Sequence, residues 1–295
     1  MELTLNDYFY SIYVPTNSHL WSERTLNNVC MFYGRYVLKT KLGVTEITAV
    51  NVRTINEWVV TSILSNKSLL SSSKLKYFKL LSAVFQQAVN LEYIQNNPCV
   101  KAKHIFNFTN TDSSVIRAFT VEEMELIIKN APKFGRITEL FVLLSFFTGA
   151  RLNEILHIRY SDMNQQNATI TINGTKTSSS KRQVTVPYWV LNRVYELQDT
   201  RNDYVFAHPN GKLRMADTMR KRFYTLLKAL NIPHRRIHDI RHTYATYLIT
   251  VAKCDVYTVS KFLGHKNPTI TLQRYTHLTQ QSKESVRLAM STLTV

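Results

Sequence analysis

Five short segments in the second half of the chain carry side chains that could act together on a phosphate ester. Arginine donates two hydrogen bonds from a planar, permanently charged group, which suits the binding of a phosphate. Reaction at phosphorus also needs a nucleophile and an acid that protonates the leaving oxygen. The residues that could fill these roles are Arg151, Glu154, Lys176, His238, Arg241, His265 and Tyr275.

Each of these residues has an ordinary explanation when it is taken alone. Arg151 could be a surface arginine in the first turn of a helix, and Lys176 a solvated lysine in a hairpin turn. Lys181 and Arg182 lie in the same hairpin, so the loop could present either of them in place of Lys176. Tyr275 is one of 16 tyrosines, and an aromatic side chain in a helix usually serves packing.

The ordered set of motifs is more specific than any single motif. The segments are Thr-Gly-Ala-Arg-Leu-Asn-Glu at 148–154, Thr-Lys-Thr at 175–177, His-Asp-Ile-Arg-His-Thr at 238–243, Leu-Gly-His at 263–265 and Tyr-Thr-His at 275–277. In this order the sequence resembles the tyrosine recombinase, or phage integrase, family. The resemblance covers the second domain by motif, and the first domain only by length and helical character.

The resemblance implies a role for each matching residue. Arg151 and Arg241 would clamp the phosphate, and Lys176 would be the general acid for the 5′ hydroxyl leaving group. Tyr275 would be the nucleophile that forms a 3′-phosphotyrosyl link. The phosphotyrosyl bond would conserve the energy of the broken phosphodiester, so no metal, cofactor or ATP is expected.

Supporting roles and partners also follow from the resemblance. His238 and His265 would hydrogen-bond the phosphate and assist proton transfer, and Glu154 would orient its neighbours. The expected partner is double-stranded DNA carrying attachment sites, bound by a homotetramer that passes through a four-way junction. Accessory DNA-bending proteins could take part. The chain has no room for a separate arm-binding domain, which predicts a simpler recombinase.

The pattern of the sequence predicts a mainly α fold with a small antiparallel sheet. A helical core-binding domain is expected over 1–102, a linker over 103–117 and a catalytic domain over 118–295. Thr120 and Glu123 have the spacing of a capping box, and the apolar run 137–147 indicates a buried helix. Strands are expected at 168–172 and 183–187, joined by a hairpin.

Composition agrees with a partner that carries many negative charges. The 37 basic and 20 acidic residues give a net charge of 37 − 20 = +17, which favours nucleic acid. No apolar stretch is long enough to span a bilayer, and no basic amphipathic helix predicts binding to a membrane surface. The three cysteines are widely spaced and the N-terminus lacks a secretory signal, so a reducing, cytoplasmic setting is expected.

Several other functions remain open at this stage. A type IB topoisomerase would use similar chemistry to relax DNA, and a non-catalytic DNA-binding protein or a ribosomal protein would share the basic charge. The pair His238 and His242 also has the spacing of a zinc-protease motif. That pattern lacks the usual glutamate base and an obvious third ligand nearby.

Overall fold

The computed structural model describes residues 3–102, 117–174, 181–265 and 267–275. Contacts between residues divide the chain into two compact units, Met1–Ser114 and Val115–Val295. Each unit has its own hydrophobic core. The predicted linker falls almost entirely outside the described residues.

The N-terminal unit is built from helices alone over its described residues. Its α-helices are α1 (Leu5–Tyr8), α2 (Val14–Ser18), α3 (Glu23–Tyr36), α4 (Lys41–Val44), α5 (Val52–Trp58), α6 (Ser71–Asn90) and α7 (Pro98–Ala102). Two π-helical turns, η1 (Phe9–Tyr13) and η3 (Val59–Leu64), continue α1 and α5, and η2 (Ile47–Ala49) is a 3-10 turn. The core contains several aromatic side chains; Phe9 and Tyr33, for example, stack with ring centroids 3.6 Å apart.

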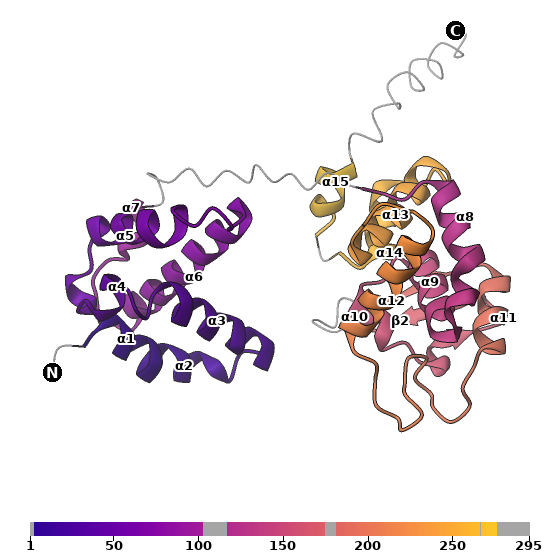
Figure 1. Cartoon of the computed structure of the whole chain (residues 1–295), viewed down its shortest axis with the longest axis horizontal. Helices are drawn as coiled ribbons and strands as arrows, with labels where there is room; N and C mark the ends of the chain where they lie inside the picture. The colour runs from indigo at the N-terminus through magenta and orange to yellow at the C-terminus, as the bar shows by residue number, and fades with distance from the viewer. Residues whose placement is uncertain (1–2, 103–116, 175–180, 266, 276–295) are drawn as a thin grey trace, which may run out of the picture. The chain divides into compact units, whose positions relative to one another are not determined.

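The C-terminal unit combines helices with one small sheet (Figure 1). Its α-helices are α8 (Val121–Asn130), α9 (Arg136–Thr148), α10 (Leu152–Leu156), α11 (Tyr188–Glu196), α12 (Ala216–Ala229), α13 (Ile237–Thr250), α14 (Val256–Leu263) and α15 (Thr269–Tyr275). The 3-10 turns are η4 (Ala131–Phe134) and η5 (Tyr160–Asp162), and the strands are β1 (Met163–Asn164), β2 (Thr169–Ile172) and β3 (Arg182–Thr185). The mainly α fold with a small antiparallel sheet is therefore confirmed.

Helix α9 is the centre of this unit. All of its residues except Arg136 and Phe147 are buried, as the apolar run predicted. Helices α8, α10, α11, α12 and α13 all contact it. Helix α8 begins with the predicted capping box, in which Thr120 and Glu123 exchange hydrogen bonds. Because a buried helix is fixed on every side, the segment that leaves its C-terminus is held in a defined position.

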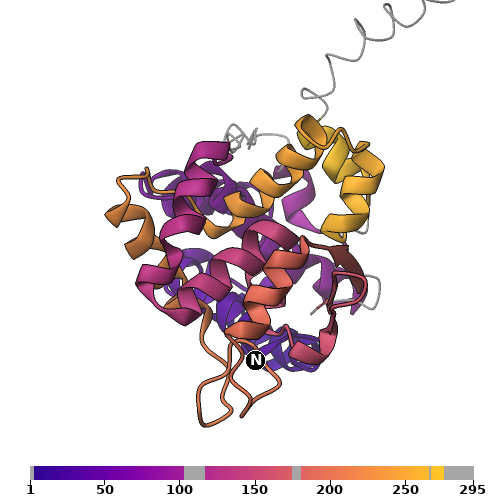
Figure 2. The same cartoon turned by 90° about the vertical axis from the view of Figure 1, so that its right-hand side faces the viewer.

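The sheet and the last helices form one side of the unit. The order of the strands is β1-β2-β3, with every pair antiparallel. Helix α14 packs against β3 and also contacts α13 and α15, an arrangement that the second view shows (Figure 2). The C-terminus of α9, the start of β3 and the C-terminus of α14 are thus brought close together.

Gly149 ends helix α9 in the left-handed conformation, with φ 58° and ψ 17°. A Cβ atom there would come within 2.8 Å of Tyr244 Cγ. We expect Gly149→Ala to lower the free energy of unfolding by about 2–4 kcal/mol, because backbone strain and overpacking act together. Urea denaturation of the full chain measures this loss. Gly211→Ala is the matched control, because Gly211 also has a positive φ of 79° but its nearest atom is 3.6 Å away. Equal losses in the two variants would show that the contact with Tyr244 is unimportant.

Candidate active site

Arg241 joins three parts of the C-terminal unit at one point. Its side chain lies on α13 and is 3% exposed. Nη1 donates a hydrogen bond of 3.0 Å to the Gly149 carbonyl, just after α9, and Nη2 donates one to the Leu263 carbonyl at the end of α14. Two of the five N–H groups of the guanidinium thus fix its position.

Arg151 lies at the N-cap of α10, directly after the Gly149 turn. Its Nη1 is 2.7 Å from Glu154 Oε1, and its backbone N–H donates to Glu154 Oε2 at 2.9 Å. The Arg151 side chain is 41% exposed, whereas that of Glu154 is 2% exposed. Glu154 therefore holds the backbone and the side chain of Arg151 in one orientation and leaves part of the guanidinium accessible.

Arg182 is a member of this cluster that the sequence did not single out. The sequence offered it only as an alternative proton donor to Lys176, but its side chain is 7% exposed and bound on two sides. Nη2 lies 2.9 Å from Glu154 Oε2, and Nε donates to the Phe262 carbonyl at 2.6 Å. A Cβ atom at Gly264 would come within 2.9 Å of Arg182 Nη1. The glycine of the Leu-Gly-His motif therefore makes room for this arginine.

The charges in the cluster are unbalanced. Burial alone would raise the pKa of Glu154, but the charge and hydrogen bonds of Arg182 and Arg151 lower it overall. Burial, together with the positive charges of Arg151 and Arg182, lowers the pKa of Arg241 to about 9. Three guanidinium groups thus surround one carboxylate, an excess of positive charge that a bound phosphate would compensate.

Replacing Glu154 by glutamine is expected to destabilise the C-terminal unit by about 3–5 kcal/mol, because it leaves the buried guanidinium group of Arg182 without its carboxylate. The full loss of stability should appear at neutral pH. It should shrink as the pH falls from 4.5, the ordinary pKa of glutamate, towards the lowered pKa of Glu154. The reason is that the carboxylate of the wild-type chain becomes protonated over this range. Hydrogen exchange of the α9 amides in the full chain measures it. Glu196→Gln breaks an exposed pair with Arg193 and should cost less than about 1 kcal/mol. Equal losses in both variants would contradict the expectation.

Tyr275 lies on α15 with its hydroxyl group inside the unit. The residue is 1% exposed, and its Oη is 2.7 Å from His242 Nδ1. A negative charge on the Tyr275 oxygen would raise the pKa of Arg241. The Tyr275 hydroxyl group therefore lies near the Arg241 guanidinium group. His238 is exposed, one turn before His242 on α13, and the two rings meet edge to face with centroids 4.9 Å apart.

His265 follows the left-handed Gly264 at the end of α14. Its Nδ1 lies 2.6 Å from Thr271 Oγ1, and Thr271 is fully buried on α15. Thr271 and Tyr275 are four residues apart, so they lie on the same face of α15. One helix thus contacts both His265 and His242.

The described residues bring together most, but not all, of the predicted set. Arg151, Glu154, Arg241 and Tyr275 act on one another electrostatically. Lys176 lies outside the described residues. His238 contacts the ring of His242, and His265 contacts Thr271.

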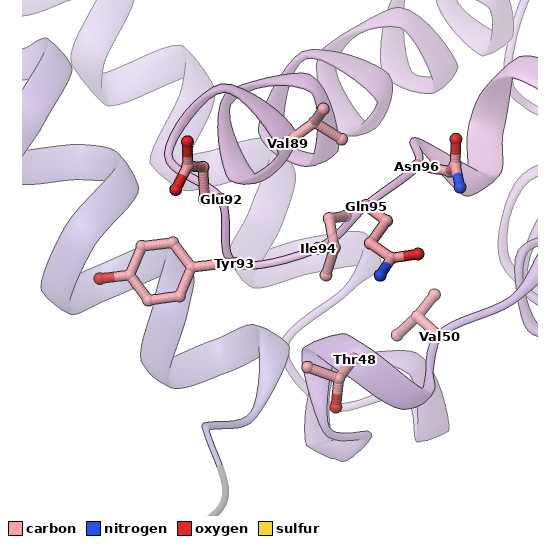
Figure 3. A pocket seen from close by; sticks show the side chains of 8 residues that line it. All are labelled: Thr48, Val50, Val89, Glu92, Tyr93, Ile94, Gln95 and Asn96. Atoms are coloured by element: carbon pink, nitrogen blue, oxygen red, sulfur yellow. The ribbon is translucent and has the colours of Figure 1, made fainter.

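The described residues can also be searched for a metal site, a membrane-spanning helix and a second pocket that could hold a phosphate. No group of three His, Cys, Asp or Glu side chains is arranged to hold a metal ion in this part of the chain, and no helix there could cross a membrane. A pocket on the N-terminal unit is lined by Thr48, Val50, Val89, Glu92, Tyr93, Ile94, Gln95 and Asn96 (Figure 3). Its walls carry a carboxylate and no basic side chain, so it does not suit a phosphate.

Comparison with known proteins identifies the family. The sequence pattern of the phage integrase family matches residues 117–282. A tyrosine recombinase XerC-like protein from Caldanaerobacter subterraneus subsp. tengcongensis is 28% identical over 291 residues, covering 85% of this chain and 73% of the relative. The ICEBs1 integrase of Bacillus subtilis is 23% identical over 269 residues, covering 82% and 70%.

Solved structures share the fold. The Tn1549 transposon integrase in complex with transposon right end DNA has a TM-score of 0.79 at 20% identity, over 98% of this chain and 99% of that one. A lambda integrase tetramer bound to a Holliday junction has a TM-score of 0.70 at 18% identity, over 92% and 77%. The chain belongs to the phage integrase family: it is a tyrosine recombinase, an enzyme that cleaves and rejoins DNA.

Proposed function

We propose that the chain recombines DNA at specific sites through attack of Tyr275 on a backbone phosphate. The observation that carries this proposal is the convergence of the Tyr275 hydroxyl with three guanidinium groups from α10, β3 and α13. The attack forms a 3′-phosphotyrosyl bond and releases a 5′ hydroxyl. The 5′ hydroxyl of a partner strand then reverses the reaction, and two such rounds pass through a four-way junction.

The proposed division of labour follows the positions of the side chains. Arg151, which is partly exposed, and Arg241, which is anchored, bind the two non-bridging oxygens of the phosphate. Glu154 and Arg182 hold these groups in place. His238 and His265 complete the hydrogen bonds to the phosphate. No step of this scheme requires a metal ion or ATP.

The general acid is assigned to Lys176. Arg182 is engaged by Glu154 and by the Phe262 carbonyl, and an arginine does not readily give up a proton. A lysine ammonium group releases its proton more easily, and Lys176 belongs to the Thr-Lys-Thr motif of the resemblance. Lys181 is exposed and is the remaining alternative.

The Tyr275 hydroxyl is buried and therefore has to be uncovered before it can attack. We expect bound DNA to do this by a shift of α15 that loosens the contact of Thr271 with His265 and keeps the contact of Tyr275 with His242. Such a requirement would keep the nucleophile inactive until a phosphate is in place.

The proposed partner is double-stranded DNA, with the N-terminal unit acting as the core-binding domain 1–102. Helix α6 is a candidate contact surface, because Lys74, Lys76 and Lys79 lie on it and it carries no carboxylate. Basic side chains bind the DNA backbone whatever its sequence. A homotetramer on two DNA sites, accessory DNA-bending proteins and a cytoplasmic location belong to the same proposal.

The decisive experiment uses duplexes that tile the DNA flanking the gene of this chain, each with a nick near the tested phosphate. The nick lets the short cleaved strand diffuse away and traps the covalent adduct, which a denaturing gel separates. Site-restricted adducts and recombinant products support the proposal. Efficient relaxation of supercoiled plasmid without a preferred site would instead indicate a type IB topoisomerase, and no adduct on any duplex would contradict the proposal.

A further inference from the structure

His242 is in direct contact with the atom that reacts. Its Nδ1 lies 2.7 Å from the Tyr275 hydroxyl oxygen, within the range of a proton-transfer hydrogen bond. The resemblance assigns proton transfer to His238 and His265, and the sequence presented His242 only as half of a zinc-like pair. We propose that His242 is the general base that accepts the phenol proton of Tyr275 during strand cleavage. This inference rests on the proposed role of Tyr275.

The chemistry of a phenol makes such an acceptor necessary. The pKa of a free tyrosine is about 10 and that of a free histidine about 6.5, so at neutral pH the phenol is protonated and the imidazole is largely able to accept a proton. Tyr275 is 1% exposed and His242 is 5% exposed. Bulk water therefore has little access to the hydroxyl, and the neighbouring ring nitrogen is in position to take its proton.

A carboxylate near His242 supports this role. Asp239 is buried three residues earlier on α13 and accepts hydrogen bonds from the Arg236 side chain and backbone. Burial alone would raise the pKa of Asp239, but the hydrogen bonds and the charge of Arg236, and to a smaller extent the charge that His242 carries when protonated, lower it overall. An ionised Asp239 in turn stabilises the imidazolium that forms, as the third group beside a nucleophile and its base does in other enzymes.

The positive charge of Arg241 acts on the Tyr275 oxygen of the same hydrogen bond. Arg241 lies close enough to Tyr275 for a phenolate charge to interact with its guanidinium. Stabilisation of the developing phenolate by Arg241, and of the imidazolium by Asp239, favours movement of the proton from oxygen to nitrogen.

The proposed step balances. As the bond from Tyr275 Oη to phosphorus forms, the phenol proton passes to His242 Nδ1, which requires the tautomer protonated at Nε2. The bond from phosphorus to the 5′ oxygen breaks with its electron pair on oxygen, and that oxygen takes a proton from the general acid. During resealing, the imidazolium returns its proton to the departing phenolate, and the 5′ hydroxyl gives its own proton to the general acid, which lost its proton during cleavage.

The test measures single-turnover adduct formation on the nicked duplex that the wild-type chain cleaves. His242→Asn keeps a polar side chain near the position of Nδ1 but provides no base. We expect it to react about 10²–10⁴-fold more slowly with little change in DNA affinity. His208→Asn, a histidine substitution elsewhere in the same unit, should react at the wild-type rate.

Replacement of Tyr275 by 3,5-difluorotyrosine distinguishes a base from a positioning residue. Fluorine lowers the pKa of the phenol, so the need for a base falls. The penalty of His242→Asn should then shrink by about tenfold or more. If fluorination leaves the penalty unchanged, or if His242→Asn reacts at the wild-type rate, the proposal is overturned. His242→Gln repeats the test should the asparagine variant not fold, as judged by hydrogen exchange of the α13 amides.

DNA with a bridging 5′ sulfur at the cleaved bond identifies the end of the reaction on which His242 acts. A thiolate leaves without protonation, so this DNA rescues variants that lack the general acid. It should not rescue His242→Asn, and rescue would overturn the proposal. A separate variant tests the proposed role of Tyr275 on which this inference rests. If Tyr275 is not the nucleophile, Tyr275→Phe, in which His242 is intact, will still form the adduct.

Discussion

Tyr275→Phe is expected to abolish formation of the covalent adduct while DNA is still bound. The substitution removes only the hydroxyl oxygen that would attack phosphorus, and loss of a nucleophile typically lowers a catalysed rate by about 10⁴-fold or more. Binding to backbone phosphates depends on basic side chains that the substitution does not touch. The measurement pairs a denaturing gel of the nicked duplex with a binding titration at fixed salt.

The structure adds a stability effect to this prediction. The Tyr275 hydroxyl is the partner of His242 Nδ1 in a buried contact, so its loss is expected to lower the free energy of unfolding by about 1–3 kcal/mol. Tyr257→Phe is the matched control, because Tyr257 lies on α14 of the same unit and is 57% exposed. Adduct formation by Tyr275→Phe at the rate of this control would show that another residue attacks the DNA.

Arg241→Lys is expected to slow strand cleavage by about 10²–10³-fold, the usual cost of losing one preorganised donor to a developing negative charge. A lysine keeps the positive charge but has a single nitrogen. It cannot donate to the Gly149 and Leu263 carbonyls and also reach a phosphate as the planar guanidinium can. The rate of adduct formation at saturating DNA isolates this effect from binding.

A second effect of Arg241→Lys concerns stability, because the Arg241 side chain links α13 to the segment after α9 and to the end of α14. At least one carbonyl loses its partner, at a cost of about 1–3 kcal/mol, and hydrogen exchange should rise at the C-terminus of α14. Arg222→Lys, on an exposed position of α12, controls for the change of side chain and should alter neither quantity. A cleavage rate in Arg241→Lys within about threefold of the wild type would contradict the assigned role.

Much of the fold was predictable because its signals are local. The capping box at Thr120 is confirmed, since it depends on residues within one helical turn. The buried helix α9 and the β2–β3 hairpin are confirmed because each follows from the periodicity of a short segment. The short strand β1 was missed, as its two residues carry no periodic signal. The π-helical turns of the N-terminal unit also had no local signature.

The sequence predicted candidate members of the site but not the contacts between them. The ordered motifs identified Arg151, Glu154, Arg241 and Tyr275 as parts of one site. They did not identify Arg182 as a partner of Glu154, because those residues are 28 positions apart and meet only when β3 packs beside α14. The sequence placed Arg182 at the start of the returning strand. That position alone does not show whether Arg182 holds Glu154 in place or donates a proton to the leaving oxygen.

The sequence by itself determined the class of enzyme and predicted a set of candidate reactive side chains, because these depend on residue type, order and short-range spacing. Only the tertiary structure decided which groups meet. Arg241 is anchored by carbonyls that lie 92 and 22 residues away in the chain, and the Tyr275 hydroxyl meets His242 across 33 residues. The physical reason is that a hydrogen bond acts over about 3 Å, and the packing of buried helices determines which distant residues come within that distance.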